Sequence, residues 1–378
     1  MSKITNCRCP VVCQDNLVSL IVERYVRYLM DDEPGERVAQ YTACIPDVEL
    51  QNVVYADYLR QISETDVRSR ALDHAAQYKL STDIITENVV EATMRTTDTD
   101  KTRAVTSTAT ADDMQKIRSL EWLCLNSQPL KALEYGNSLA RAFIANDKLQ
   151  PAREVYSLLD TWLESFMIQS KKALHAGLDV LAGNTYDSEL KDTLNAMREH
   201  NCINIYLKAI DVWAAYERTK ANQPQEPTLR PRVRFSDGLI NDNATSKYTN
   251  DKNEWVAKMK QLSDEFIAIL LGGNNSSNRP MFGYPSGFLA DSFTDAVISD
   301  RLQQLQTIRT LCIPICFSRL LDVLQDRKDY DTCLKLVPEL VQNRPFQYNW
   351  YECFTQQDLQ RVMHQYKQCR LAMIDSVR

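Results

Sequence analysis

RTLCIPICF (309–317) and LQDRKDYDTCLKL (324–336) are the stretches that decide the fold. Apolar residues recur there at the spacing of one helix face, and they are Ile313, Phe317, Leu320, Leu321 and Leu324, then Tyr330, Cys333, Leu334 and Val337. A short polar turn, 325–329, separates the two runs. The pattern predicts a helix hairpin whose two apolar stripes face the same way, so the hairpin needs a neighbouring helical layer to cover it.

Composition supports helices throughout the chain. Hydrophobic residues make up 44% and charged residues 25%, an ordinary globular balance. Nine glycines in 378 residues fall far below the usual share of about 7%, which disfavours turn-rich β structure. A second hairpin is predicted at 136–159, with its turn at 146–150 and Pro151 in the first turn of its second helix. Since no strict repeat length is present, we predict an all-α fold, an irregular α-helical solenoid of stacked helix hairpins.

Changes in helical periodicity and in polar and proline content divide the chain. Residues 97–111 are Thr-rich and polar, 221–250 contain Pro224, Pro227 and Pro231, and 272–288 hold four of the nine glycines. The predicted division is an unassigned leader 1–16, a helical solenoid segment 17–96, a flexible linker 97–111, a second helical segment 112–220, a long loop 221–250 and a C-terminal helical module 251–378 with a flexible insertion 272–288.

Charge and hydropathy exclude several classes of protein. The net charge of −6 gives no field that attracts nucleic acid. The basic run 230–235 lies in a proline-rich loop and is interpreted as a solvated linker rather than a docking motif. The N-terminus lacks the apolar core of a secretory signal. The longest apolar runs, 266–271 and 311–317, are far shorter than the roughly 18 residues that span a bilayer.

Cysteines and histidines offer no chemistry at the level of motifs. We expect most cysteines to be small buried hydrophobes on helical stripes, in a reducing compartment; these are Cys44, Cys124, Cys202, Cys312, Cys316, Cys333 and Cys369. Cys7, Cys9 and Cys13 lack the partner ligands of a zinc site. The four histidines lie in separate segments, and no phosphate-binding, dinucleotide or zinc-protease motif occurs. We therefore predict a protein that is not an enzyme, with no catalytic, cofactor-binding or metal-binding residues.

The last predicted helix begins at Thr355, where TQQD resembles a capping box with Asp in place of Glu. Apolar residues fall on more than one side of this helix. Two explanations stay open: the same chain covers both sides, or one side binds a partner. The candidate interface residues are Leu359, Val362, Met363, Tyr366, Leu371, Met373 and Ile374.

Several segments, in order and at similar separations, carry a family resemblance. They are Trp122-Leu123, residues 132–137 (ALEYGN), 143–145, 198–203 (REHNCI), 206–209, 311–314 (LCIP), 330–336 (YDTCLKL), Phe354 and Leu359. From about Leu17 to its end, the chain resembles the C-terminal half of the hundred-and-seven-kilodalton nucleoporin family of the Y-shaped outer-ring complex of the nuclear pore. The leader before Leu17, the segment 272–287 and Pro338 depart from that family pattern.

The resemblance implies a structural scaffold in the nuclear pore outer ring, located in the nucleus at the nuclear envelope. It implies that the C-terminal helices bind other outer-ring nucleoporins, chiefly the hundred-and-thirty-three-kilodalton subunit. Transport of mRNA and protein would depend on this scaffold indirectly, with no direct contact to nucleic acid and only a peripheral relation to the nuclear membrane. An α-solenoid adaptor of a vesicle coat or chaperone complex is the alternative, and an enzyme built on a helical frame is a third reading.

Overall fold

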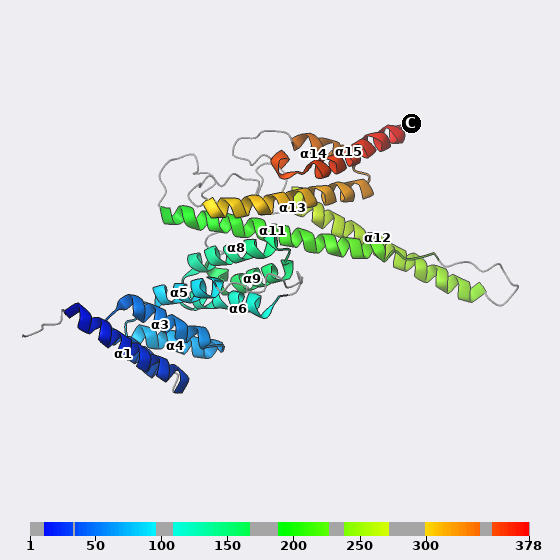
Figure 1. Ribbon diagram of the computed structural model, residues 1–378. Helices are drawn as coiled ribbons and strands as arrows, with labels where there is room; N and C mark the ends of the chain where they lie inside the picture. The colour runs from blue at the N-terminus through cyan, green and yellow to red at the C-terminus, as the bar shows by residue number, and fades with distance from the viewer. Residues whose placement is uncertain are drawn as a thin grey trace, which may run out of the picture. The chain divides into compact units, whose positions relative to one another are not determined.

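The computed structural model describes residues 11–32, 35–95, 109–166, 188–226, 238–271, 299–340 and 350–377. Every regular element in these ranges is a helix, which confirms the all-α prediction. The chain divides into two compact units, Met1–Ala196 and Met197–Arg378, and Figure 1 labels their helices.

The first unit is a succession of short helices that pack on near neighbours in the sequence. They are α1 (Val11–Asp32), α2 (Glu36–Thr42), α3 (Val48–Gln61), α4 (Thr65–Gln77), α5 (Thr82–Arg95), α6 (Ala111–Ser119), α7 (Glu121–Leu125), α8 (Pro129–Ala145) and α9 (Leu149–Trp162). Local chemistry sets several starting points: the Asp47 side chain accepts hydrogen bonds from the first amides of α3, and Thr110 and Asp113 form a capping box at α6. Helix α5 contacts α3, α4, α6 and α7. This nearest-neighbour packing is the organisation of an α-helical solenoid.

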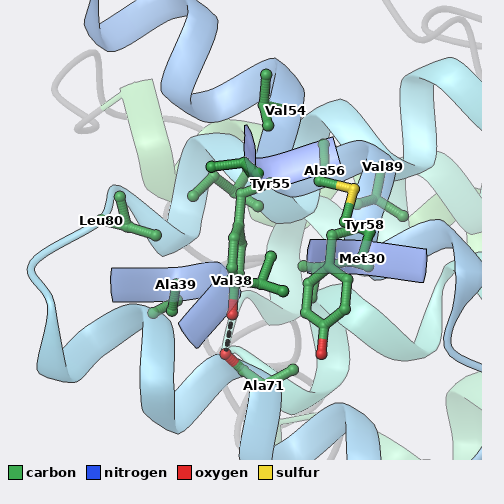
Figure 2. Packing of buried hydrophobic residues seen from close by; sticks show 14 of the residues in the cluster. Met30, Val38, Ala39, Val54, Tyr55, Ala56, Tyr58, Ala71, Leu80 and Val89 are labelled. Atoms are coloured by element: carbon green, nitrogen blue, oxygen red, sulfur yellow. Dashed lines mark hydrogen bonds between the residues drawn. The ribbon is translucent and has the colours of Figure 1, made fainter. Parts of the chain in front are cut away.

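Apolar side chains of α1 to α5, with Trp122 of α7, form one hydrophobic core cluster of the first unit (Figure 2). Tyr55 lies at its centre, fully buried, and its hydroxyl donates a 2.7 Å hydrogen bond to the carbonyl of Ala71 in α4. The bond satisfies the one polar atom of a large buried ring, and burial raises the pKa of the Tyr55 hydroxyl. The ring of Tyr58 lies 5.4 Å from that of Tyr55. The Tyr55 hydrogen bond therefore joins α3 to α4 inside this core.

The predicted hairpin at 136–159 is present as α8 and α9. Its turn includes Asp147 at φ 57°, a left-handed conformation that Asp tolerates better than most residues. The two helices approach closely at Gly136, where an added Cβ would lie 2.5 Å from Cδ1 of the buried Leu159. Glycine at this position leaves room for the Leu159 side chain in its present conformation.

The second unit is built from longer helices around α13. They are α11 (Ser188–Ala221), whose residues from Met197 onward belong to this unit, α12 (Gly238–Leu271), α13 (Ser299–Asp326), α14 (Tyr330–Glu339), the 3-10 helix η1 (Trp350–Cys353) and α15 (Gln356–Val377). Helix α13 contacts α12, α14, α15 and η1. Tyr216 of α11 donates a 2.8 Å hydrogen bond to Asp326 at the end of α13. Thus α13 is the central helix of the unit (Figure 1).

The hairpin of α13 and α14 confirms the first sequence prediction, with one correction. All five predicted residues of α13, from Ile313 to Leu324, are buried. In α14 the buried face is instead Cys333, Leu336 and Val337, continued by Leu340 directly after the helix, while Tyr330 and Leu334 are half-buried. The buried stripe is rotated because α14 packs against both α13 and α15, so its covered side is not set by the hairpin alone.

Three other expectations are corrected. The predicted loop 221–250 ends early because α12 begins at Gly238: its prolines stop at Pro231, and the polar residues that follow do not break a helix. Helix α1 begins at Val11, within the predicted leader, and α2 was not predicted. Cys44 is exposed rather than buried, since it follows the last residues of α2 at the surface. Residues 96–108, the basic run 230–235, 272–298, Cys7 and Cys9 lie outside the described residues.

No helix in the described ranges is both long enough and apolar enough to cross a bilayer.

Candidate partner interface

The terminal helix α15 is positioned at its first residue by the predicted capping box. The backbone amide of Thr355 donates to Asp358 Oδ2 at 2.9 Å, and the amide of Asp358 donates to Thr355 Oγ1 at 3.2 Å. Just before it, the Phe354 ring meets the Phe317 ring of α13 edge-on, with centroids 5.8 Å apart. The cap and the aromatic contact together determine where α15 begins on the second unit.

One side of α15 packs on its own fold. Val362, Gln365 and Cys369 are buried and recur at the spacing of one helix face. Gln365 donates to Asp322 Oδ1 at 2.5 Å, and its carbonyl accepts from Gln325 of α13 at 3.1 Å. Burial raises the pKa of the Asp322 carboxyl, although the hydrogen bond from Gln365 and the nearby Arg361 lower it in part. On this side, α15 makes an apolar contact with α13, and hydrogen bonds from side-chain amides strengthen it.

The opposite side of α15 presents apolar residues to solvent. Met363 is 55% exposed, Leu371 54% and Ile374 50%. Their spacing of eight and three residues places them on one face at about 100° per residue, away from the buried side. Lys367 and Arg370 are exposed among them. An apolar helix face edged with basic residues suits a partner helix with apolar and acidic residues.

The seven residues predicted for the interface do not form one surface. Met363, Leu371, Met373 and Ile374 are exposed, Leu359 and Tyr366 are half-buried, and Val362 is 2% exposed. Periodicity alone placed Val362 and Met363 in one stripe because they lie three and four residues after Leu359. The structure separates them to the inner side and the outer side of α15.

A second exposed apolar face, which the sequence interpretation did not single out, lies on α1 in the first unit. Leu17 is 60% exposed, Ile21 62%, Tyr25 43% and Tyr28 58%. Their spacing of four, four and three residues marks one helix face. The signal is present in the sequence, but the same spacing is also that of a buried stripe, so the sequence alone does not show which face is exposed.

The thiols of the second unit behave as buried hydrophobes. Cys312 and Cys316 are at most 1% exposed, in agreement with the prediction that they are core residues. Burial raises the pKa of the Cys316 thiol to about 12 and that of Cys312 well above its usual value. Since the thiolate is the reactive form, these cysteines are unreactive at neutral pH.

Stacked helices and a terminal helix with an exposed apolar face define the chain as an α-helical solenoid of the scaffold type. The family model described as nuclear pore protein 84/107 matches residues 12–370. Nuclear pore complex protein Nup107 of Rattus norvegicus is 24% identical over 365 residues, which cover 94% of this chain and 37% of that protein, and the Homo sapiens protein gives the same values. Nup107 of Drosophila melanogaster is 23% identical over 381 residues, 96% of this chain and 42% of that protein.

The chain belongs to the nuclear pore protein 84/107 family, a family of structural, non-enzymatic proteins of the nuclear pore at the nuclear envelope. It spans 37 to 42% of the length of these curated relatives.

Proposed function

We propose that this chain is a structural part of the nuclear pore outer-ring scaffold and binds another outer-ring subunit through α15. The hundred-and-thirty-three-kilodalton subunit is the proposed partner. Transport of mRNA and protein through the pore then depends on the chain indirectly, because the ring holds the channel open. Family membership favours this function over that of a vesicle-coat or chaperone adaptor.

The exposed face of α15 carries the proposal. A monomeric protein gains nothing from holding Met363, Leu371 and Ile374 in water on a well-packed helix, whereas a partner that covers them gains the burial free energy of three large side chains. The inner face, anchored by Gln365 and Cys369, keeps the outer face in a fixed position. Such preorganisation lowers the entropic cost of binding.

Capture from nuclear extract tests the proposal. The bait is the full chain, compared with a Leu371→Asp/Ile374→Asp variant that changes only exposed positions and keeps the buried face of α15. Gln357→Asp is the matched control, since it adds a charge to an exposed residue in the first turn of the same helix. We expect outer-ring nucleoporins on the full chain and the control, identified by mass spectrometry, and their loss from the double variant. Recovery of coat or chaperone components without nucleoporins would overturn the proposal in favour of the adaptor.

A further inference from the structure

The second unit contains a pocket of about 340 Å³ between α11, α13 and α15. Its apolar lining consists of Trp213, Pro314, Ile315 and Val362. The volume lies at the lower end of the range of ligand pockets, about 300–1,000 Å³. The pocket therefore has room for an inserted side chain.

Two polar atoms of the lining residues have no hydrogen-bond partner among the residues that the structure describes. They are Arg319 Nη1 and Ser318 Oγ, and both atoms are buried. Ser318 as a whole is only 7% exposed. Buried polar atoms are nearly always hydrogen-bonded in folded proteins, because an unpaired one loses its hydration without compensation. Unpartnered donors on two lining residues of a pocket indicate that a ligand acceptor belongs there.

The pocket is lined by two arginines and two aspartates, and the surroundings of Arg319 favour an anion. Arg319 lies over the Trp213 ring, 5.3 Å from its centroid, which holds the guanidinium in place. The two carboxylates of the pocket are already engaged: Asp358 accepts from Thr355, and Asp322 accepts from Gln365 and lies 3.6 Å from Arg361. Among the described residues no carboxylate is within ion-pair distance of Arg319, so its charge is unmatched.

The surface next to the pocket favours a protein segment over a small carboxylate. Ile315, at the pocket, is 41% exposed, and Leu311, one helical turn earlier on α13, is 40% exposed. They form a short apolar strip that leads to the pocket. A small anion would leave this strip uncovered, whereas a helix or extended peptide would cover the strip and insert one side chain.

We propose that the pocket receives a glutamate or aspartate side chain of a protein partner, carried on a segment whose apolar residues cover Ile315 and Leu311. The carboxylate accepts hydrogen bonds from Arg319 Nη1 and from the Ser318 hydroxyl. The apolar part of the segment packs on Trp213. The inference rests on the proposed function, because it assigns the chemistry of a segment on the partner that this chain binds.

Selection from a phage-displayed library of random linear peptides, with the purified full chain as target, tests the pocket without nuclear proteins. We expect the recovered peptides to share an acidic residue next to Leu, Ile or Phe. Their affinity should fall about 10-fold or more on Arg319→Gln, because hydrogen bonds between charged groups are the strong ones. Arg218→Gln, the same change at an exposed residue of α11 outside both the pocket and the α15 face, should bind as the wild type does.

A double-mutant cycle tests whether Arg319 contacts the acidic residue of the peptide. Replacing the peptide Glu by Gln should cost about 10-fold on the wild type and nothing further on Arg319→Gln. If Arg319→Gln fails to fold by circular dichroism, Ile315→Asp replaces it, since this exposed position adds a charge that repels the carboxylate. Peptides without an acidic consensus, no recovered peptides, or equal binding by the variants would overturn the pocket assignment. If the chain captures nucleoporins from extract but the peptide selection fails, only the pocket assignment is rejected. If the selected peptides share an acidic residue but no nucleoporins are captured, the proposed function is rejected.

Discussion

Arg68 and Glu121 form a 2.6 Å ion pair between α4 and α7, although 53 residues separate them in sequence. The Arg68 side chain is 7% exposed, donates to the carbonyls of Ile62 and Arg118, and stacks on Trp122 with 5.0 Å to the ring centroid. Burial lowers the pKa of Arg68, and Glu121 partly offsets that effect. Because two of its three partners, Arg118 and Glu121, lie 50 and 53 residues further along the chain, Arg68 ties α4 to α6 and α7.

Glu121→Gln should lower the free energy of unfolding by about 2 kcal/mol, because it leaves a buried guanidinium without its counter-charge. Urea denaturation followed by circular dichroism measures the loss. Glu91→Gln is the matched control, since Glu91 pairs with an Arg95 side chain that is 79% exposed and glutamine keeps an oxygen that can accept from Tyr135, and it should cost about 0.5 kcal/mol or less. Equal losses from the two variants would show that burial adds nothing to the Arg68 pair.

Gly136→Ala should destabilise the α8–α9 hairpin by about 1–3 kcal/mol, because its Cβ would meet Leu159 at 2.5 Å. The same change in a Leu159→Ala background should be neutral or stabilising, since that background removes the clash and alanine favours helix over glycine by about 1 kcal/mol. Thermal denaturation of the four chains gives the coupling. A similar loss in both backgrounds would mean that Leu159 is not the obstacle.

Asp113 predicts an acid-sensitive contribution to stability. Its side chain is 3% exposed and lies 2.9 Å from Lys148 Nζ. Burial by itself raises the pKa of Asp113, but hydrogen bonds from Thr110 and Lys148 outweigh it and hold the pKa below the usual 3.8. A carboxyl whose pKa is depressed in the folded state stabilises that state above its unfolded pKa, and the effect is lost as the pH falls through the folded value.

Asp113→Asn should therefore cost about 1–2 kcal/mol at neutral pH, and its difference from the wild type should shrink below about pH 3.8. Urea midpoints measured from neutral pH down to about pH 3 follow this change. Asp147→Asn, which removes a charge from an exposed residue of the α8–α9 turn, should show a small difference at every pH. A constant loss for Asp113→Asn across the series would contradict the sign of the pKa shift.

Ile374→Asp should leave the fold intact, because the side chain is 50% exposed. Val362→Asp should detach α15 from α13, because Val362 is 2% exposed and a buried carboxylate there would have no partner. Circular dichroism and limited proteolysis separate the two outcomes. Unfolding by Ile374→Asp would show that this residue is covered within the chain, and the outer face of α15 would no longer be a candidate interface.

Leu336→Ala should cost about 2–4 kcal/mol, because Leu336 is 6% exposed, whereas Leu334→Ala should cost about 1 kcal/mol at its half-buried position. Denaturation in urea compares them directly, with the same atoms removed from the same helix. A larger loss of stability at Leu334 than at Leu336 would show that the buried face of α14 is the one that apolar periodicity predicts.

Local spacing accounts for much of the fold that the sequence predicts. The periodicity of apolar residues and the turn and capping residues placed the end of α8, both ends of α9 and the start of α15 close to their observed positions. The Thr355 capping box was predictable because its four residues are contiguous. For α12 the predicted loop was wrong, because prolines block a helix only where they stand and polar residues can continue a helix.

The candidate site was predictable only in part. The sequence identified α15 and its excess of apolar residues, but not which side would be covered, since Val362 and Met363 are equally apolar. The pocket could not be predicted from the sequence, because Trp213, Arg319 and Val362 come from three helices separated by long stretches of chain.

The sequence by itself determined that this protein is a series of helices, because hydrogen bonding and amphipathicity within a helix involve residues at most a few positions apart. Only the tertiary structure decided which apolar faces are covered and which polar residues are buried, among them Arg68, Glu199, His200 and Arg309. Covering a face requires a partner surface from elsewhere in the chain. The exposed sides of α1 and α15 remain open because no described helix of their own unit packs there.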